Sequence, residues 1–318
     1  MEIDGKTSYN REVLVYEIAG ISHKGGTVVN VVLDCIPCYL KQARNTLGQT
    51  EVSEDKAMQI LHKILPLIPE LDPQGTPAEN STLILWKVNE LLGTNDPFAK
   101  AKRESNELAI KLLPQLRERV MQSSDPLYTA LQVSVAGNII DLGIFKDFDV
   151  EASIEEALGR KFAHDDYSFF KEKLKGAREV MILGDNSGEI AFDKLLAEQL
   201  KASGVKVTYV VKGSPILNDA TWEDAEYVGM KDVASVMSNG SGYLGTVLKT
   251  CSAEFCTALD EADLVISKGQ ANYESLESAY EVRENTYFLL RAKCEVVAES
   301  LGVKLGEMAF KKREPSVG

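Results

Sequence analysis

Apolar residues recur at intervals of three and four between Cys38 and about Leu142, and this spacing predicts a helical N-terminal region. The clearest stripe consists of Leu108, Leu112, Leu116 and Val120. Ser53 and Asp96 are suited to cap the helices that follow them, and Gly93 is suited to end the helix before it. We therefore expect helices over residues 83–92, from Pro97 onward, and over 126–140.

The pattern changes in the second half, where short apolar runs alternate with helical stretches. The expected strands are 179–183, 207–211, 233–237, 264–266 and 287–290. The expected helices between them are 189–202, 218–227 and 248–259. This alternation predicts an α/β fold with a parallel sheet buried on both faces. We expect Lys311–Gly318 to be a frayed tail.

Three regions follow from these patterns. Residues 1–30 form an N-terminal extension in which the alternation over 12–18 suggests a strand, although no role can be assigned to it. Residues 31–150 are expected to form an all-helical domain, and residues 151–318 an α/β domain that carries the catalytic site.

Composition excludes several classes of partner. The chain has 48 acidic and 35 basic residues and a formal net charge of −13, which disfavours binding to nucleic acids and to anionic membranes. The five cysteines do not fit the even count of a small disulfide-bonded secreted protein. The apolar runs are too short to span a bilayer, and the start of the chain does not read as a signal peptide. We expect a cytoplasmic protein.

The loops that follow four predicted strands carry the candidate chemistry. Each contains glycine together with Asp, Asn, Ser or Lys, in the segments 184–189, 212–219, 238–242 and 267–273. Parallel strands end at the same edge of a sheet, and ligands of open α/β sheets bind beyond that edge. The four loops together are therefore suited to hold a hard cation beside a phosphate group.

Asp185, Asn186 and Asp219 are the candidate metal ligands, because their oxygens suit Mg²⁺, Mn²⁺ and related ions. A structural interpretation is also open for each loop taken alone. Asp-Asn-Ser-Gly is a common turn sequence, and Asp219 could be the N-cap of the next helix. The occurrence of all four loops at one sheet edge favours the functional interpretation.

The other two loops offer groups for the phosphate. Ser238, Gly240 and Gly242 form a loop whose backbone N–H groups could surround an anion. Lys268 would neutralise phosphate charge and stabilise the transition state, both as a catalytic and as a substrate-binding residue. Taken alone, the glycine loop could be a flexible turn, and Lys268 could be an ordinary solvated lysine.

Six motifs occur in order along the chain between about Val32 and Phe310. They are Asp34–Cys38, Asn95–Phe98 with Lys100 and Asn106 behind it, Ala136–Asp141, Gly184–Glu189, Lys212–Thr221 and Lys268–Glu274. As an ordered set they resemble the DUF89 family of metal-dependent damage-control phosphatases, and in particular its short prokaryotic and archaeal branch.

The resemblance implies a Rossmann-like C-terminal domain with a helical N-terminal region. It implies hydrolysis of small phosphorylated metabolites, such as damaged sugar phosphates or nucleotides, with Mn²⁺, Ni²⁺, Co²⁺ or Mg²⁺. The metal ligands of the family fall on Asp185, Asn186 and Asp219, and its active-site lysine falls on Lys268. Gln270 stands where some relatives carry an aspartate, so the role of that carboxylate stays open here.

The mechanism we expect is metal-assisted attack of water on phosphorus. The carboxylate of Asp185 or Asp219 could act as nucleophile instead, but both are better used as ligands. Asn138, late in a predicted helix, either reaches the site from the helical half or marks a break where helices pack closely.

The pair Cys35 and Cys38 leaves three interpretations open. A Cys-x-x-Cys sequence after an apolar run can be a redox motif, and it can also supply half of a structural zinc site. The remaining length does not suit a thioredoxin-like fold, and further zinc ligands are not evident. The third interpretation is two inert thiols. A Cys-x-x-Cys pair is characteristic of the branch that the chain resembles.

Three other functions compete with a phosphatase. An S-adenosylmethionine-dependent carboxyl methyltransferase would need a glycine-rich first turn, and the chain has no G-x-G-x-x-G sequence there. A non-catalytic protein that binds phosphorylated metabolites would bind without turnover. A thiol oxidoreductase would act without metal through Cys35. The sequence identifies neither the substrate, the physiological metal nor the oligomeric state.

Overall fold

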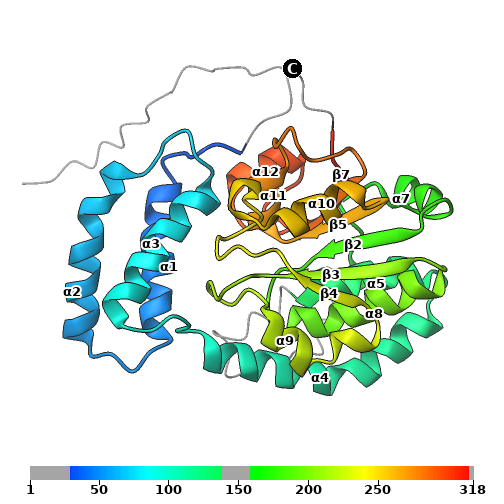
Figure 1. Ribbon diagram of the computed structural model, residues 1–318, viewed down its shortest axis with the longest axis horizontal. Helices are drawn as coiled ribbons and strands as arrows, with labels where there is room; N and C mark the ends of the chain where they lie inside the picture. The colour runs from blue at the N-terminus through cyan, green and yellow to red at the C-terminus, as the bar shows by residue number, and fades with distance from the viewer. Residues whose placement is uncertain (1–28, 138–157, 315–318) are drawn as a thin grey trace, which may run out of the picture.

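A seven-stranded sheet organises the computed structural model, which describes residues 29–137 and 158–314 (Figure 1). The strands are β1 (His164–Asp165), β2 (Glu179–Leu183), β3 (Lys206–Val211), β4 (Ser235–Ser238), β5 (Leu264–Lys268), β6 (Thr286–Arg291) and β7 (Met308–Lys312). Their order is β1-β7-β6-β5-β2-β3-β4, and only the β6–β7 pair among them is antiparallel. The strand predicted over 12–18 lies outside the described residues.

Helices cover both faces of the sheet, as the apolar strands require. The helices of this half are α7 (Tyr167–Leu174), α8 (Glu189–Ala202), α9 (Trp222–Tyr227), α10 (Ala253–Glu261), α11 (Gln270–Leu276) and α12 (Glu295–Leu301). In β2, Val180 and Ile182 enter the core under α8, whereas Met181 and Leu183 enter the core under α10–α12. Both faces are therefore buried, which confirms the predicted α/β class.

The N-terminal region consists of two groups of helices. The helices are α1 (Cys35–Gly48), α2 (Glu54–Ile64), α3 (Pro77–Leu92), α4 (Ala99–Gln122) and α5 (Pro126–Ala136). α1, α2 and α3 share a small core of their own and lie beside the carboxyl ends of the strands (Figure 1). α4 and α5 instead contribute to the core between the sheet and α8. None of the described helices is both long and apolar enough to cross a membrane.

Local capping explains where the helices of this region begin and end. The Ser53 hydroxyl accepts from the Lys56 backbone N–H, as predicted for the N-cap of α2. α3 begins at Pro77, earlier than expected, because Thr76 and Glu79 form a capping box. It ends at Gly93, whose φ of 75° is the left-handed conformation typical of a C-cap.

Several predicted boundaries were wrong. α4 begins at Ala99, and Asp96 is not its N-cap; instead the Asp96 carboxylate accepts from the Phe98 N–H in a short turn before the helix. α9 begins only at Trp222, because Thr221 caps it. α1 begins at Cys35, before the predicted start, while β4 and α10 both begin later than predicted.

The C-terminal tail was also predicted wrongly. Lys311 and Lys312 belong to β7, which pairs antiparallel with β6 so that Phe310 lies opposite Leu289. Residues 315–318 lie outside the described part of the chain. The division of the chain at residue 150 stays a prediction. α5 packs against α8 and β6, α4 packs against α8, and both belong to the main core and not to the small core of α1–α3.

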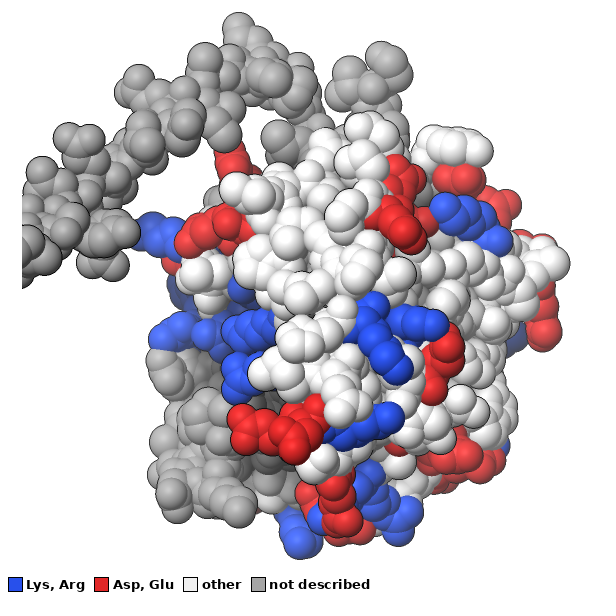
Figure 2. Space-filling model, turned by 90° about the vertical axis from the view of Figure 1, so that its left-hand side faces the viewer, with Lys and Arg blue, Asp and Glu red and all other residues white. Residues whose placement is uncertain are grey.

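Figure 2 shows the face on the side of α1–α3. Basic and acidic side chains are interspersed on this face around an uncharged area. The net negative charge of the chain is therefore not concentrated there.

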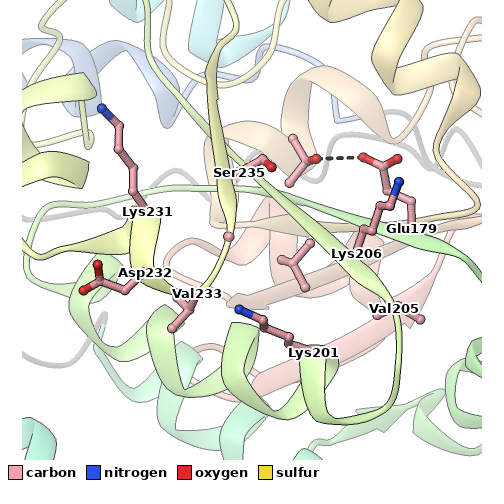
Figure 3. Close-up of a pocket in the computed structure, with 11 residues that line it drawn as sticks. Glu179, Lys201, Val205, Lys206, Lys231, Asp232, Val233 and Ser235 are labelled. Carbon is pink, nitrogen blue, oxygen red and sulfur yellow. Dashed lines mark hydrogen bonds between the residues drawn. The ribbon is translucent and has the colours of Figure 1, made fainter.

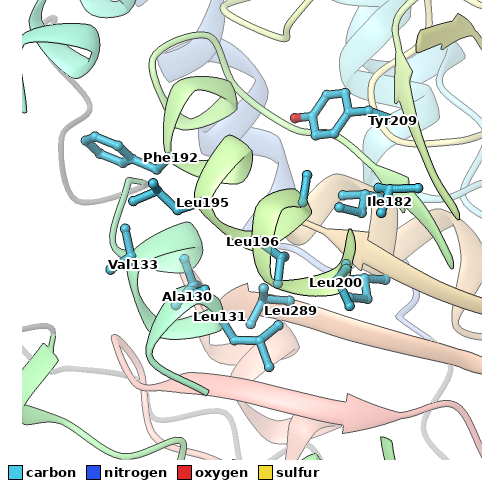
Figure 4. Packing of buried hydrophobic residues seen from close by; sticks show 14 of the residues in the cluster. Ala130, Leu131, Val133, Ile182, Phe192, Leu195, Leu196, Leu200, Tyr209 and Leu289 are labelled. Carbon is cyan, nitrogen blue, oxygen red and sulfur yellow. The ribbon is translucent and has the colours of Figure 1, made fainter. Parts of the chain in front are cut away.

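The packing of α5 against α8 generates a prediction for stability. Leu131 of α5 is fully buried near Leu196, Leu200 and Leu289 (Figure 4). We expect Leu131→Ala to lower the free energy of unfolding by about 2–5 kcal/mol, because it leaves a cavity in the main core. Leu83→Ala on α3, where the side chain is 45% exposed, should change it by less than about 0.5 kcal/mol. Urea unfolding followed by circular dichroism measures both, and equal losses would contradict the core assignment.

Candidate functional site

The loops after β2 and β3 are joined directly to each other by backbone hydrogen bonds. The Ser187 N–H donates to the Asn218 carbonyl and the Ala220 N–H to the Asp185 carbonyl, each at 2.8 Å. Asn186 and Asp219 form an antiparallel bridge between the loops. Adjacent parallel strands thus bring the three predicted ligands to one place at the carboxyl edge of the sheet.

The two carboxylates at this place are buried and close enough to influence each other. Asp185 and Asp219 are 8% and 3% exposed. Burial raises the pKa of Asp219 to about 7, with the Lys212 ammonium opposing that rise and the negative charge of Asp185 adding to it. Lys212 Nζ lies 3.4 Å from Asp219 Oδ2 and also donates to the Gly245 carbonyl. A buried pair of carboxylates of this kind favours a bound cation.

Two oxygens at the site have no hydrogen-bond partner within the described residues. They are Ser187 Oγ and Asp219 Oδ2, both without solvent contact. The contact of Asp219 Oδ2 with Lys212 is an ion pair only. The Asn186 amide donates to Asp185 Oδ2 at 3.1 Å. Buried oxygens are normally satisfied, so an oxygen-bound metal ion fits this donor set.

The exit of β5 approaches the site through a glycine. Gly269 has a φ of 82°, and a Cβ at this position would lie 2.1 Å from Asp185 Oδ2. Only glycine provides both the conformation and the space. The loop after β5 therefore approaches the Asp185 side chain through the backbone of Gly269.

A hollow of about 530 Å³ lies at the opposite, amino-terminal edge of β2, β3 and β4 (Figure 3). Its charged lining includes Glu179, Lys201, Lys206 and Lys231. Glu179 accepts a hydrogen bond from Thr208 at 2.7 Å. Because ligands of such sheets bind at the carboxyl edge, this hollow is not the candidate active site.

Residues 31–309 match the family model of the damage-control phosphatase ARMT1-like domain. The chain belongs to this family. A damage-control phosphatase of Archaeoglobus fulgidus is 37% identical over 283 residues, which cover 87% of this chain and 97% of the relative. A damage-control phosphatase of Pyrococcus horikoshii is 32% identical over 285 residues, covering 88% and 97%.

The fold of the ARMT1-like chain agrees with a solved structure. The crystal structure of a DUF89 family protein from Pyrococcus horikoshii aligns with a TM-score of 0.81 and 30% identity, over 90% of this chain and 99% of the other. The resemblance to DUF89 stated from the motifs is therefore confirmed, and so is the α/β fold with its helical N-terminal region.

Lys268 lies within β5 and not, as the sequence had suggested, in the loop after it, and its role toward a phosphate stays a prediction. It is the last residue of β5 and is fully buried. Its ammonium group donates to Glu189, to Asp193 Oδ1 at 2.5 Å and to the Ser134 carbonyl at 3.1 Å. An ammonium group has three hydrogens, and these three acceptors take all of them. This arrangement does not favour direct contact of Lys268 with a phosphate group, and Lys212 is the lysine paired with Asp219.

The network around Lys268 holds two carboxylates for one ammonium group. Burial raises the pKa of Glu189 to about 8; Lys268 opposes the rise, while Asp193 and Asp185 add to it. Burial alone would lower the pKa of Lys268, but Asp193 and Glu189 raise it above its usual value. Asp193 also accepts from the hydroxyls of Ser134 and Tyr209, at 2.6 and 2.7 Å. The network anchors the start of α8 to β5 and α5.

The glycine loop after β4 packs closely on its neighbours. The Gly240 N–H donates to Ser238 Oγ at 3.0 Å, so it is already used within the loop. A Cβ at Gly240 would lie 2.9 Å from Ser252 Cβ, and one at Gly242 would lie 2.2 Å from Ser214 Oγ. These glycines therefore permit close packing of loops. Their role as an anion site stays a prediction, for which Gly240 does not offer a free N–H.

Asn138 lies outside the described residues, so its role stays a prediction. Its neighbour Gly137 lies against α8, where a Cβ would come within 2.9 Å of Glu189 Cγ and of Phe192 Cδ2. Close helix packing therefore explains the glycine of this motif.

Cys35 and Cys38 lie in the first turn of α1, and both thiols are free. Burial raises the pKa of Cys35, with the nearby Glu274 adding to the rise, whereas a redox motif of the thioredoxin type needs a lowered pKa. Cys294 lies close enough for its own pKa to be affected by Cys35. Over residues 29–137 and 158–314, no cluster of three His, Cys, Asp or Glu side chains is suited to hold a metal ion. A zinc site at the cysteine pair is therefore not supported.

Sequence reasoning missed the contribution of buried polar residues outside the four loops. Lys102 and Asn106 of α4 contact the segment after Asp219, and Asp193 of α8 holds Lys268. Lys102 and Asn106 are four residues apart and share one face of α4. Polar residues at helical spacing among apolar ones were the available signal, but their partners could not be read from the sequence.

Glu189 provides a test of this electrostatic description. Its pKa is about 8 in the fold and ordinarily 4.5, so the folded chain binds a proton that the unfolded chain releases. The stabilisation of the fold that comes from this proton on Glu189 is complete below pH 4.5 and is lost as the pH rises through 8. We expect the free energy of unfolding to fall from pH 5 to pH 8, by up to about 1.4 kcal/mol per pH unit for one proton. Glu189→Gln cannot titrate there and should show a smaller fall.

Urea unfolding at pH 5, 6, 7 and 8 measures the difference. Glu172→Gln is the control, because the Glu172 side chain is 72% exposed and pairs only with Lys175 among the described residues. It should keep the pH dependence of the wild type. A Glu189→Gln protein that follows the wild type at every pH would show that Glu189 is not the titrating group.

Proposed function

We propose that the protein is a metal-dependent phosphomonoesterase that hydrolyses small phosphorylated metabolites at the carboxyl edge of its sheet. The phosphatase class predicted from the sequence is confirmed by the family and by the names of its relatives. The observation that carries the proposed site is the pair of buried carboxylates, Asp185 and Asp219, on two loops that hydrogen-bond to each other.

The residues that would hold the metal are Asp185, Asn186 and Asp219. Their donor atoms are oxygens, and Asp219 Oδ2 makes no hydrogen bond in the described part of the chain. Mn²⁺, Ni²⁺, Co²⁺ and Mg²⁺ are the candidate ions. A divalent ion bound there would polarise a phosphoryl oxygen and lower the pKa of a water molecule.

The protein side chains have separate tasks in this proposal. Asp185 and Asp219 serve as ligands, so water rather than a carboxylate attacks the phosphorus. Lys212 balances the charge of Asp219 and donates a hydrogen bond to the Gly245 carbonyl, which holds that backbone segment beside the site. The Lys268 network fixes the start of α8 beside Asp185 and keeps that region dry. Exclusion of water strengthens the electrostatic interactions with the phosphoryl group.

The substrate would enter between the strand ends and α3. The loop after β4 contacts α3 through a hydrogen bond from the Leu244 N–H to Thr82 Oγ1 at 3.0 Å. Trp86 of α3 meets Tyr243 edge-on, with ring centroids 4.7 Å apart. The phosphate would face the loops after β2 and β3 that carry Asp185, Asn186 and Asp219, which we call the ligand loops. The organic part of the metabolite would face these aromatic residues.

Removal and return of metal tests the activity. We expect hydrolysis of p-nitrophenyl phosphate to stop after chelation and to return with Mn²⁺, Ni²⁺, Co²⁺ or Mg²⁺. Binding of phosphorylated metabolites without any turnover would instead favour the non-catalytic alternative.

Substitution of the ligands tests the site itself. Asp185→Asn and Asp219→Asn should each lower kcat/KM by about 100-fold or more, because each removes a charged oxygen from the ion. Asp232→Asn, at an exposed carboxylate near the opposite edge, should keep wild-type activity. Thermal unfolding should show that all three proteins are folded. Full turnover by Asp185→Asn at saturating Mn²⁺ would remove Asp185 from the site.

A further inference from the structure

Asn106 of α4 hydrogen-bonds to the loop after β2 and to α9, the helix that follows the loop after β3. The Gly188 N–H donates to Asn106 Oδ1 at 2.6 Å, and Asn106 Nδ2 donates to Asp224 Oδ1 at 2.8 Å. The side chain is 1% exposed. One buried amide therefore connects the loop after β2 with the segment after β3.

Both partners lie next to proposed ligands. Gly188 ends the turn that begins with Asp185 and Asn186. Asp224 holds Thr221, two residues after Asp219, because its Oδ2 accepts from the Thr221 N–H at 2.8 Å and from the Thr221 hydroxyl at 2.7 Å. On one side, the amide of Asn106 contacts Gly188, two residues after Asn186. On the other side, it contacts Asp224, which holds Thr221, two residues after Asp219.

Lys102, one turn before Asn106 on α4, supplies the compensating charge. Its ammonium group lies 3.1 Å from Asp224 Oδ2, 3.3 Å from Asp96 Oδ2 and 3.4 Å from Thr221 Oγ1. It is 4% exposed. This ammonium group faces the buried Asp224 carboxylate, which also accepts three hydrogen bonds.

The contact between α4 and the loop after β2 is close. Gly188 has a φ of 81°, and a Cβ there would lie 3.1 Å from Ser105 Cβ. The loop can therefore rest on α4 only while residue 188 is glycine. The helix serves as a rigid support for the loop.

We propose that Asn106 is a positioning residue that holds the two ligand loops at the separation needed for a divalent ion. This inference rests on the proposed function. The position needs one acceptor, for Gly188, and one donor, for Asp224, which an amide provides at once. A carboxylate would lack the donor and would repel Asp224, and alanine would lack both groups. Partners of this kind, which orient the metal ligands, commonly control metal affinity.

The test is the affinity of the whole chain for Mn²⁺, measured by isothermal titration calorimetry without substrate. We expect Asn106→Asp and Asn106→Ala to raise the Kd about 10- to 100-fold. Asn106→Asp is nearly isosteric and creates no cavity, so it separates loop positioning from packing. Circular dichroism and thermal unfolding establish that each protein is folded at the temperature of the titration.

Asn80 of α3 gives a matched control. It is also 1% exposed, its Oδ1 accepts from the Asp72 N–H at 3.2 Å, and its Nδ2 donates to the Asp72 carbonyl at 2.7 Å. Asn80→Asp and Asn80→Ala therefore make the same chemical changes away from the ligand loops. They should lower the melting temperature but leave the Kd for Mn²⁺ within about twofold of the wild type.

The outcomes separate this inference from the proposed function. If the wild type does not bind Mn²⁺, or if Asp219→Asn binds it equally well, the proposed metal site is wrong and this inference falls with it. If the wild type binds and a folded Asn106→Asp binds with the same Kd, Asn106 has only a structural role. Asn106→Asp remains the deciding variant if Asn106→Ala does not fold.

Discussion

The site depends on two backbone hydrogen bonds that join the loops after β2 and β3. Because of these hydrogen bonds, the buried side chains of Asp185 and Asp219 lie next to each other. β2 and β3 pair in parallel along five residues, so the start of both loops is fixed by the sheet before any side chain contributes. The cost is the burial of two carboxylates: burial raises the pKa of Asp219, and the negative charge of Asp185 adds to that rise.

Buried lysines offset only part of this negative charge. Lys212 pairs with Asp219, Lys268 with Glu189 and Asp193, and Lys102 with Asp96 and Asp224. Carboxyl groups therefore outnumber ammonium groups around the loops of Asp185 and Asp219; Asp185 adds one more, and Glu189 carries a proton below about pH 8. Buried charges are tolerated only when they are compensated. A divalent cation would supply the missing positive charge, which links the stability of this region to the chemistry that we propose for it.

The sequence predicted the sheet, and predicted that Asp185, Asn186 and Asp219 lie together, for one reason: the loops after parallel strands start at a common edge. It failed where contacts between distant segments decide. Lys268 was expected in a loop because the strand was ended at Ile266, yet β5 continues to Lys268. With the alternation of a strand, Lys268 follows Leu264 and Ile266 toward α5 and α8, so a longer strand would have revealed its burial. The sequence of the antiparallel strand β7 showed no comparable pattern by which the strand could have been predicted.

Two helices of the N-terminal region, α4 and α3, contact the loops of the site in different ways. This difference explains why the activity could be inferred from the sequence but the substrate could not. α4 belongs to the main core and holds the ligand loops through buried polar groups. α3 shares a small core with α1 and α2, and its Ala78 and Leu85 also pack against Ile216 and Leu244 in the loops after β3 and β4. In the function that we propose, side chains of α3 would form part of the wall that contacts the metabolite. The motifs contain the loops of Asp185 and Asp219 and their support on α4, whereas the position of α3 beside these loops becomes known only from the folded chain.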